Sequence, residues 1–294
     1  MAALFAANCI FWCLLFAVLF IPIHASAIGA FFGLLIGVVY WMMCAWASEK
    51  FMLDLYGAQP ITSDLAPNLV EMVQSLCDDA GLEMPLLYSA PLTEPNAFAV
   101  TRGNRTPCIV LTNGLSQHLS KEEVRAVIAL MLQRLAHPAA PVWTVAATLA
   151  GLPLYAACSG TLHDTFKDRF AVDEKTGMTV IDRIVLACIV PPCAAAMRLA
   201  ISPKQLAVAD FHAAAMAGAA ELSSALNKIS AGVPKTWWGG SPYNPATAML
   251  FAVPPVSIPG PLEDYPTAFC RRAQAAFAVP LLGADERRRA FLAS

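Results

Sequence analysis

The chain has 294 residues, of which 57% are hydrophobic and 14% are charged, and its formal net charge is −2. A composition this apolar excludes an ordinary soluble domain, so the segments that a lipid bilayer would accept have to be identified first. The near-neutral charge, without a cluster of Lys and Arg, argues against nucleic acid as a partner. The nine cysteines form no C-x-x-C pair. They indicate reduced thiols and a soluble part that faces the cytosol.

The first 48 residues contain no Asp, Glu, Lys or Arg. Because a transmembrane helix needs about 20 apolar residues, this stretch predicts two spans, residues 2–23 and 27–47, with a turn at Pro22, His24 and Ser26. A signal peptide cleaved near residue 27 is the alternative. It lacks a basic segment at its start, and a second full-length apolar run follows at once. We therefore predict a tight transmembrane hairpin.

The segment after the hairpin mixes helical and strand patterns. Apolar residues at helical spacing predict a helix over 66–82 that ends at Gly81. Short apolar runs predict strands over 84–90, 97–100 and 108–112, and turn residues between the last two indicate a hairpin. A second helix begins after Leu119, where Ser120 and Glu123 have the spacing of a capping box.

Two further apolar runs follow the second helix. The first, residues 135–162, is uncharged and long enough to cross a bilayer, although it contains three prolines. The second, residues 184–201, contains Pro191, Pro192 and Arg198, so it either crosses with Arg198 reaching the surface or stays re-entrant or interfacial. Lys and Arg after the first hairpin indicate that the segment from Glu49 faces the cytosol.

Five motifs together resemble one family: PNAFAV (95–100), IVLTNGL (109–115), LSKEEVRAVIA (119–129), SPKQLAVADFHAAAMAG (202–218) and NPATAMLF (244–251). They are similar to HtpX-type membrane zinc proteases, a family that includes CAAX prenyl proteases and mitochondrial stress proteases. The resemblance implies an α+β membrane protein: a helix-rich, zincin-type domain with a small β-hairpin or sheet and about four transmembrane helices. The expected units are a hairpin (1–48), a cytosolic subdomain with the motif helix (49–138), two membrane segments (139–201), and the second half of the domain with the C-terminal tail (202–294).

The same resemblance maps the catalytic positions onto side chains that cannot do this chemistry. In the family, His-Glu-x-x-His on the motif helix supplies two zinc ligands and a general base, and a Glu four residues before a later Asp supplies the third ligand. Here the two His positions are Leu130 and Arg134, the base position is Met131, and the residue four before Asp210 is Leu206. We therefore expect a catalytically inactive protein without zinc. The alternative is an active membrane metalloendopeptidase with a relocated zinc site, although none of the five histidines has a partner at ligand spacing.

Two other groups of residues are candidate functional elements. Asn96, Ala97 and Phe98 match the family's edge strand, which can bind an extended peptide by strand addition; plain packing of Phe98 in the core is the competing interpretation. Arg134 needs solvent or a carboxylate, and Asp210 is its candidate partner.

These expectations define a multi-pass pseudoprotease in a bacterial inner membrane, with its protease-like domain in the cytosol. It would bind a membrane-protein or peptide client, or modulate a partner, in membrane-protein quality control. Its partners would be the lipid bilayer and that client, and no nucleic acid. A structural membrane subunit is a third interpretation, and it predicts that substitutions around Phe98 affect only stability.

Overall fold

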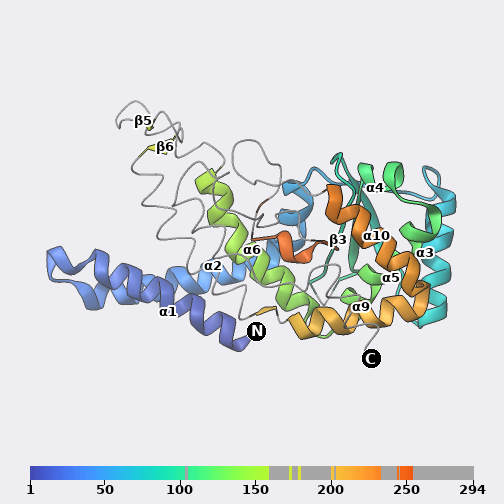
Figure 1. Ribbon diagram of the computed structural model, residues 1–294. Helices are drawn as coiled ribbons and strands as arrows, with labels where there is room; N and C mark the ends of the chain where they lie inside the picture. The colour runs from blue at the N-terminus through green and yellow to red at the C-terminus, as the bar shows by residue number, and fades with distance from the viewer. Residues whose placement is uncertain are drawn as a thin grey trace.

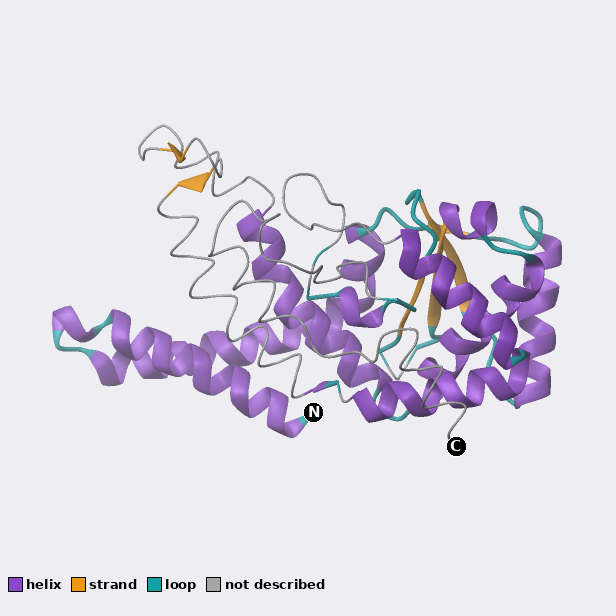
Figure 2. Cartoon of the chain, in the orientation of Figure 1, coloured by secondary structure: helices purple, strands orange, loops and turns teal. Residues whose placement is uncertain are grey.

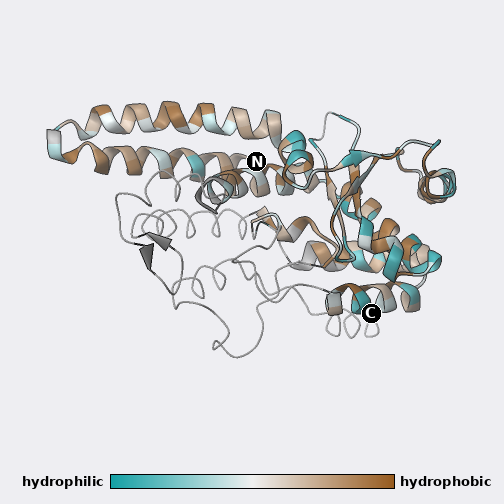
Figure 3. Ribbon diagram, turned by 90° about the horizontal axis from the view of Figure 1, so that it is seen from above, coloured by the Kyte–Doolittle hydropathy of each residue, from teal (hydrophilic) through white to brown (hydrophobic). Residues whose placement is uncertain are grey.

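The computed structural model describes residues 1–102, 105–158, 172–173, 178–179, 200–201, 203–232, 244 and 246–253. Its N-terminal part is a helical hairpin of α1 (Ala2–Leu19) and α2 (Ser26–Leu55), joined by η1 (Ile21–Ile23). His24, with φ of 54°, makes the left-handed turn after η1. Both helices are long and apolar enough to cross a membrane. They extend away from the rest of the protein (Figure 1) and are hydrophobic along most of their length (Figure 3). The structure thus contains the predicted helical hairpin, and both of its helices are candidate membrane spans.

Glycines at every fourth position let the two helices approach closely. Gly29, Gly33 and Gly37 lie on one face of α2 and are buried. A Cβ atom added at Gly33 would lie 2.3 Å from the backbone oxygen of Trp12 on α1. Because no side chain larger than hydrogen fits there, the contact between α1 and α2 depends on this glycine.

A four-stranded mixed sheet follows the hairpin, made of β1 (Gln59–Pro60), β2 (Leu86–Ala90), β3 (Ala97–Val100) and β4 (Cys108–Thr112) in the order β1-β2-β4-β3. β3 and β4 form the predicted antiparallel hairpin, whereas β2 and β4 are parallel. The connection from β1 to β2 includes α3 (Pro67–Ala80), which ends at Gly81 with φ of 64°, as its sequence predicts.

Helices cover the sheet (Figure 2). The helices after the sheet are α4 (Asn113–His118), α5 (Lys121–Ala136), α6 (Ala140–Cys158), α9 (Pro203–Ala217) and α10 (Ala219–Gly232), followed by the short η2 (Ala248–Leu250). A separate two-stranded sheet is formed by β5 (Val172–Asp173) and β6 (Met178–Thr179). The predicted capping box is present at the start of α5: the Ser120 hydroxyl accepts from the Glu123 amide, and the Glu123 carboxylate accepts from the Ser120 amide. α5 is the central helix, since it contacts β3, β4, α9 and α10.

The third apolar run forms a helix that packs largely inside the protein. α6 lies against α2, and Trp143, Ala146, Ala147 and Ala150 are buried in the same core cluster as Phe98 and Phe251. Over the described ranges, only α1 and α2 meet the length and hydropathy required of a span. The expectation of about four transmembrane helices is therefore not confirmed, and most of the fourth run lies outside the described residues.

Candidate functional site

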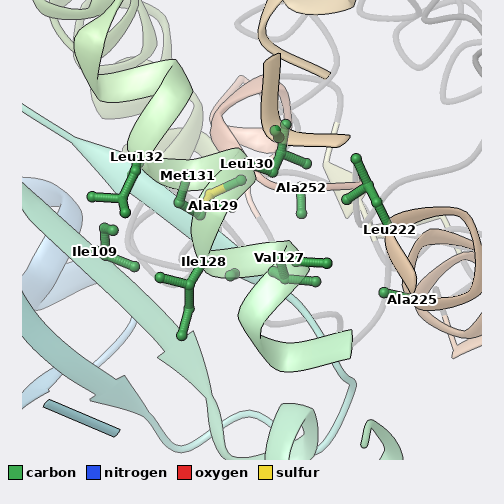
Figure 4. Close-up of a cluster of buried hydrophobic side chains, with 14 of the residues drawn as sticks. Ile109, Val127, Ile128, Ala129, Leu130, Met131, Leu132, Leu222, Ala225 and Ala252 are labelled. Atoms are coloured by element: carbon green, nitrogen blue, oxygen red, sulfur yellow. The ribbon is translucent and has the colours of Figure 1, made fainter. Parts of the chain in front are cut away.

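The site predicted from the sequence lies where α5 crosses α9. Leu130 and Met131 are completely buried, and Leu206 on α9 is 3% exposed. Figure 4 shows Leu130 on the side of α5 that faces Ala252 and Leu222, while Ile128 and Leu132 point towards Ile109 on the sheet. The positions that the family comparison assigns to a zinc ligand and a general base thus form part of a close-packed apolar core.

Arg134 is the exception in this apolar region. It is 4% exposed, and its guanidinium contacts three segments of the chain. Nη1 donates to the backbone oxygen of Phe251 at 2.5 Å, and Nη2 donates to that of Ala252 at 3.3 Å. Nη2 also lies 3.9 Å from Asp210 Oδ1 on α9. The structure therefore brings together the two residues of the expected polar pair and adds two carbonyl partners, which compensate for burying the cation.

Sequence reasoning missed those carbonyls because they come from a segment 117 residues away. The motif NPATAMLF was noted there only as similar to the family, without a role for its final residues. The one available signal was the position of Phe251 at the end of this motif, with Ala252 directly after it. Backbone acceptors leave no trace in residue type, so the signal could not identify them as partners of Arg134.

Of the proposed peptide-binding residues, Ala97 and Phe98 lie in β3, an outer strand of the four-stranded sheet, and Asn96 directly precedes it. Their side chains are not open to solvent: Asn96 is 1% exposed, and Ala97 and Phe98 are fully buried. The outer edge of β3 is also paired with residues 251–253. Phe98 and Phe251 form an antiparallel bridge, and the amide of Ala252 donates to the backbone oxygen of Ala97 at 2.7 Å.

Phe98 belongs to a buried aromatic cluster. Its ring centroid lies 4.7 Å from that of Phe251 and 5.1 Å from that of Tyr56, the residue that follows α2. The Tyr56 hydroxyl and Thr247 Oγ1 share a hydrogen bond, and burial raises the pKa of Tyr56 to about 12. Tyr56 therefore remains a neutral hydrogen-bonding group over the physiological pH range. This cluster joins the end of the membrane hairpin to the sheet edge.

The residues at the mapped positions do not fit a zinc ion. Leu130, Met131 and Leu206 offer no ligand of the kind zinc prefers, and the Arg134 cation repels a metal. Through the described residues, no group of three or more His, Cys, Asp or Glu side chains lies together as a metal site. His118 Nδ1 contacts the backbone oxygen of Gly114, and His137 stacks on Trp143. His163 lies outside the described residues.

A hydrophobic helical hairpin joined to a helix-rich domain, in which two crossing helices carry the mapped ligand positions, is the arrangement expected of a membrane peptidase of the resembled class. Residues 63–258 match the family model described as Peptidase family M48. The chain therefore belongs to peptidase family M48, in its HtpX type.

Relatives named "Protease HtpX homolog" match most of the chain. The protein from Desulforapulum autotrophicum is 34% identical over 215 residues, which cover 72% of this chain and 68% of that protein. The protein from Syntrophobacter fumaroxidans is 32% identical over 238 residues, or 79% and 84% of the two chains. The protein from Aquifex aeolicus is 32% identical over 244 residues, or 80% of each chain. No solved structure matches the chain.

Family membership corrects the expectation that this protein has no cofactor. HtpX-type proteins of family M48 are zinc metalloproteases, so zinc is the cofactor of the class to which the chain belongs. The expectation rested on the four mapped positions and on the spacing of the five histidines, and neither is enough to exclude the metal of the family. Since those positions do not fit zinc, a bound ion would need ligands from other side chains, among them side chains outside the described residues.

Proposed function

We propose that this chain is an HtpX-type membrane protein that binds extended polypeptide clients without cleaving them and acts in membrane-protein quality control. The observation that carries the proposal is the state of the mapped base position. Met131 is fully buried, and its neighbours along α5, Leu130 and Leu132, are buried and apolar. An attacking water held there would lack polar partners, which makes hydrolysis at this place unfavourable.

Arg134 supports the same proposal. Its guanidinium is engaged by two backbone oxygens and by Asp210, and it is buried. A guanidinium held in this way links α5 to α9 and to residues 251–252, and it has no role in activating water. It also puts a positive charge where the family places a metal ligand, so the mapped site itself supplies no step of peptide hydrolysis.

The membrane hairpin supports the proposed class of client. Large apolar side chains, among them Phe31, Leu35 and Trp46, are more than half exposed on α1 and α2. A bilayer would cover these side chains. The helix-rich domain is attached directly to the end of α2 through Tyr56, so it lies close to the membrane surface, where polypeptides leaving or entering the bilayer are found.

A second candidate function is zinc-dependent proteolysis with ligands drawn from other residues. Membership of peptidase family M48 favours it, as do relatives whose names identify them as proteases. The two candidate functions differ in what happens to the client polypeptide. A binding protein returns its client intact, whereas a protease returns fragments.

The test uses the full-length protein in lipid nanodiscs, with zinc supplied and a fluorescently labelled unfolded membrane polypeptide as client. The HtpX homologue of Syntrophobacter fumaroxidans, prepared identically, is the comparison protein. We expect this chain to retain the labelled polypeptide uncleaved on native gels, while the comparison protein degrades it. Fragments that disappear on chelation and return with zinc would contradict the proposal and establish the second candidate. If the protein neither binds nor cleaves the labelled polypeptide, both candidate functions are contradicted and a structural subunit is favoured.

A further inference from the structure

The edge of β3 is occupied by the chain's own residues in the manner of a bound peptide. The Ala252 amide donates to the Ala97 backbone oxygen at 2.7 Å. The Asn96 side chain completes the pairing, because its Nδ2 donates to the Val253 oxygen at 2.7 Å and its Oδ1 accepts from the Val253 amide at 3.3 Å. These contacts are made to the main chain of 251–253, as in strand addition.

The side chains of this segment fill defined places. The Phe251 ring packs on Phe98 and Tyr56, at centroid distances of 4.7 and 5.3 Å, and Phe251 is 1% exposed. Ala252 is fully buried and lies beside Leu130 (Figure 4). Because Ala252 is completely buried, a long or branched side chain in its place would have no room beside α5. The place therefore accepts an aromatic residue followed by a small one.

The strand pairing between residues 251–253 and β3 is limited to a single bridge. Phe98 and Phe251 form an isolated bridge outside the regular ladder of the sheet. Arg134 supplies the remaining backbone contacts, to the oxygens of Phe251 and Ala252. Apart from the packing of Phe251 and Ala252 and the Arg134 contacts, only a few hydrogen bonds hold this segment to the strand that the family resemblance identifies with peptide binding.

We propose that residues 251–253 are an internal ligand of the β3 edge and that clients resemble this segment. Such a client is an extended peptide with an aromatic residue, then a small residue, then an aliphatic one. The proposal rests on the proposed function, since it names what that binding site accepts. The internal segment competes with the client, so the apparent affinity of the client falls in proportion to the fraction of molecules in which the edge is open.

Two variants change the fraction of molecules with an open β3 edge in opposite directions. Ala252→Pro removes the amide that donates to Ala97, and Phe251 already has the extended backbone, φ −74° and ψ 155°, that a residue before proline prefers. Ala97→Cys with Ala252→Cys places two thiols on adjacent backbones, so that oxidation fixes the segment on the edge and reduction releases it. The single-cysteine variants control for disulfides with native cysteines.

The probe is a synthetic peptide containing Phe-Ala-Val with a photoreactive group, added to the full-length protein in nanodiscs, with Asp-Ala-Val as its control. We expect binding of the Phe-Ala-Val peptide to increase about fivefold in Ala252→Pro, the effect of one hydrogen bond. In the oxidised double-cysteine variant we expect binding to be lost and to return on reduction. Crosslinks should map to β3.

Hydrogen exchange on the unmodified protein gives a measurement that needs no variant. The amides of Ala252 and Val253 should exchange at least tenfold faster than that of Val110 on β4, because the segment opens without global unfolding. Exchange of these three amides at one rate would overturn the proposal. Equal peptide binding by the unmodified protein, Ala252→Pro and the oxidised double-cysteine variant would also overturn it. Either result leaves the intact capture of a larger client, and hence the proposed function, to be judged by its own assay.

Discussion

Arg134 Nη2 lies 3.9 Å from Asp210 Oδ1, and the two side chains are 4% and 11% exposed. This contact joins α5 to α9: Arg134 stands at a mapped His position of α5, and Asp210 lies four residues after Leu206, the mapped ligand position of α9. A buried ion pair gains little net stability over well-packed apolar residues, because both charges lose their hydration. Removing one partner is far more costly, since the other charge stays buried without it. The pair is therefore a sensitive point of the fold.

Arg134→Met should lower the free energy of unfolding by about 3–5 kcal/mol, because Asp210 loses a buried cation and two backbone oxygens lose their donor. Thermal unfolding of the protein in nanodiscs measures the change. Arg125→Met is the matched control: Arg125 pairs with Asp79 at 3.5 Å, but the side chains are 35% and 67% exposed. It should cost less than about 1 kcal/mol. Equal losses would mean that the Arg134 contact is solvated.

Leu130→Ala should destabilise the protein by about 2–5 kcal/mol, because it leaves a cavity between α5, α10 and residue 252. Leu86→Ala, at a position that is 47% exposed on β2, removes the same atoms and should cost much less. Chemical denaturation of both variants gives the comparison. A neutral Leu130→Ala would indicate that the mapped site is open and hydrated.

Gly33→Leu should separate α1 from α2, because even a Cβ atom at this position would lie 2.3 Å from the Trp12 oxygen. Leu35→Ala, on the lipid-facing side of α2 with 52% exposure, is the control and should leave the hairpin intact. Crosslinking between cysteines introduced on the two helices reports their separation. Unchanged crosslinking in Gly33→Leu would disprove the close contact.

Glu123 should contribute to stability at neutral pH and lose that contribution in acid. Burial alone would raise the pKa of Glu123, but hydrogen bonds from Lys228, Ser224 and the Ser120 amide outweigh it and lower the pKa below its usual value of 4.5. A lowered pKa in the folded state means that the stabilisation is complete above about pH 4.5 and disappears as the pH falls through the folded-state value.

Glu123→Gln should therefore reduce stability at pH 7 and flatten its decline between neutral pH and acid. Glu71→Gln, at an exposed position on α3, serves as the control and should leave the pH profile as it is. The midpoint of thermal unfolding, followed from pH 7 to pH 3, measures both. A Glu123→Gln profile parallel to that of the unmodified protein would contradict the assignment.

The local elements were predictable because their signals lie within a few residues. The capping box of Ser120 and Glu123, the left-handed end of α3 at Gly81, and the charge-free hairpin each depend on contacts between near neighbours in the chain. The parallel pairing of β2 with β4 was not predicted, since it links strands separated by β3. The exclusion of a cofactor was wrong for another reason: it relied on individual ligand positions and histidine spacing, whereas the family is defined over most of the chain.

The sequence by itself determined the membrane hairpin, the helices and strands around α5, and the replacement of the family's ligand side chains by Leu130, Met131, Arg134 and Leu206. Only the tertiary structure decided the surroundings of those side chains. It buries Leu130 and Met131, supplies Arg134 with the oxygens of Phe251 and Ala252, and pairs residues 251–253 with the edge of β3. The physical reason is that backbone donors and acceptors are the same in every residue, so their pairing over more than 100 residues depends on packing and leaves no mark in the sequence.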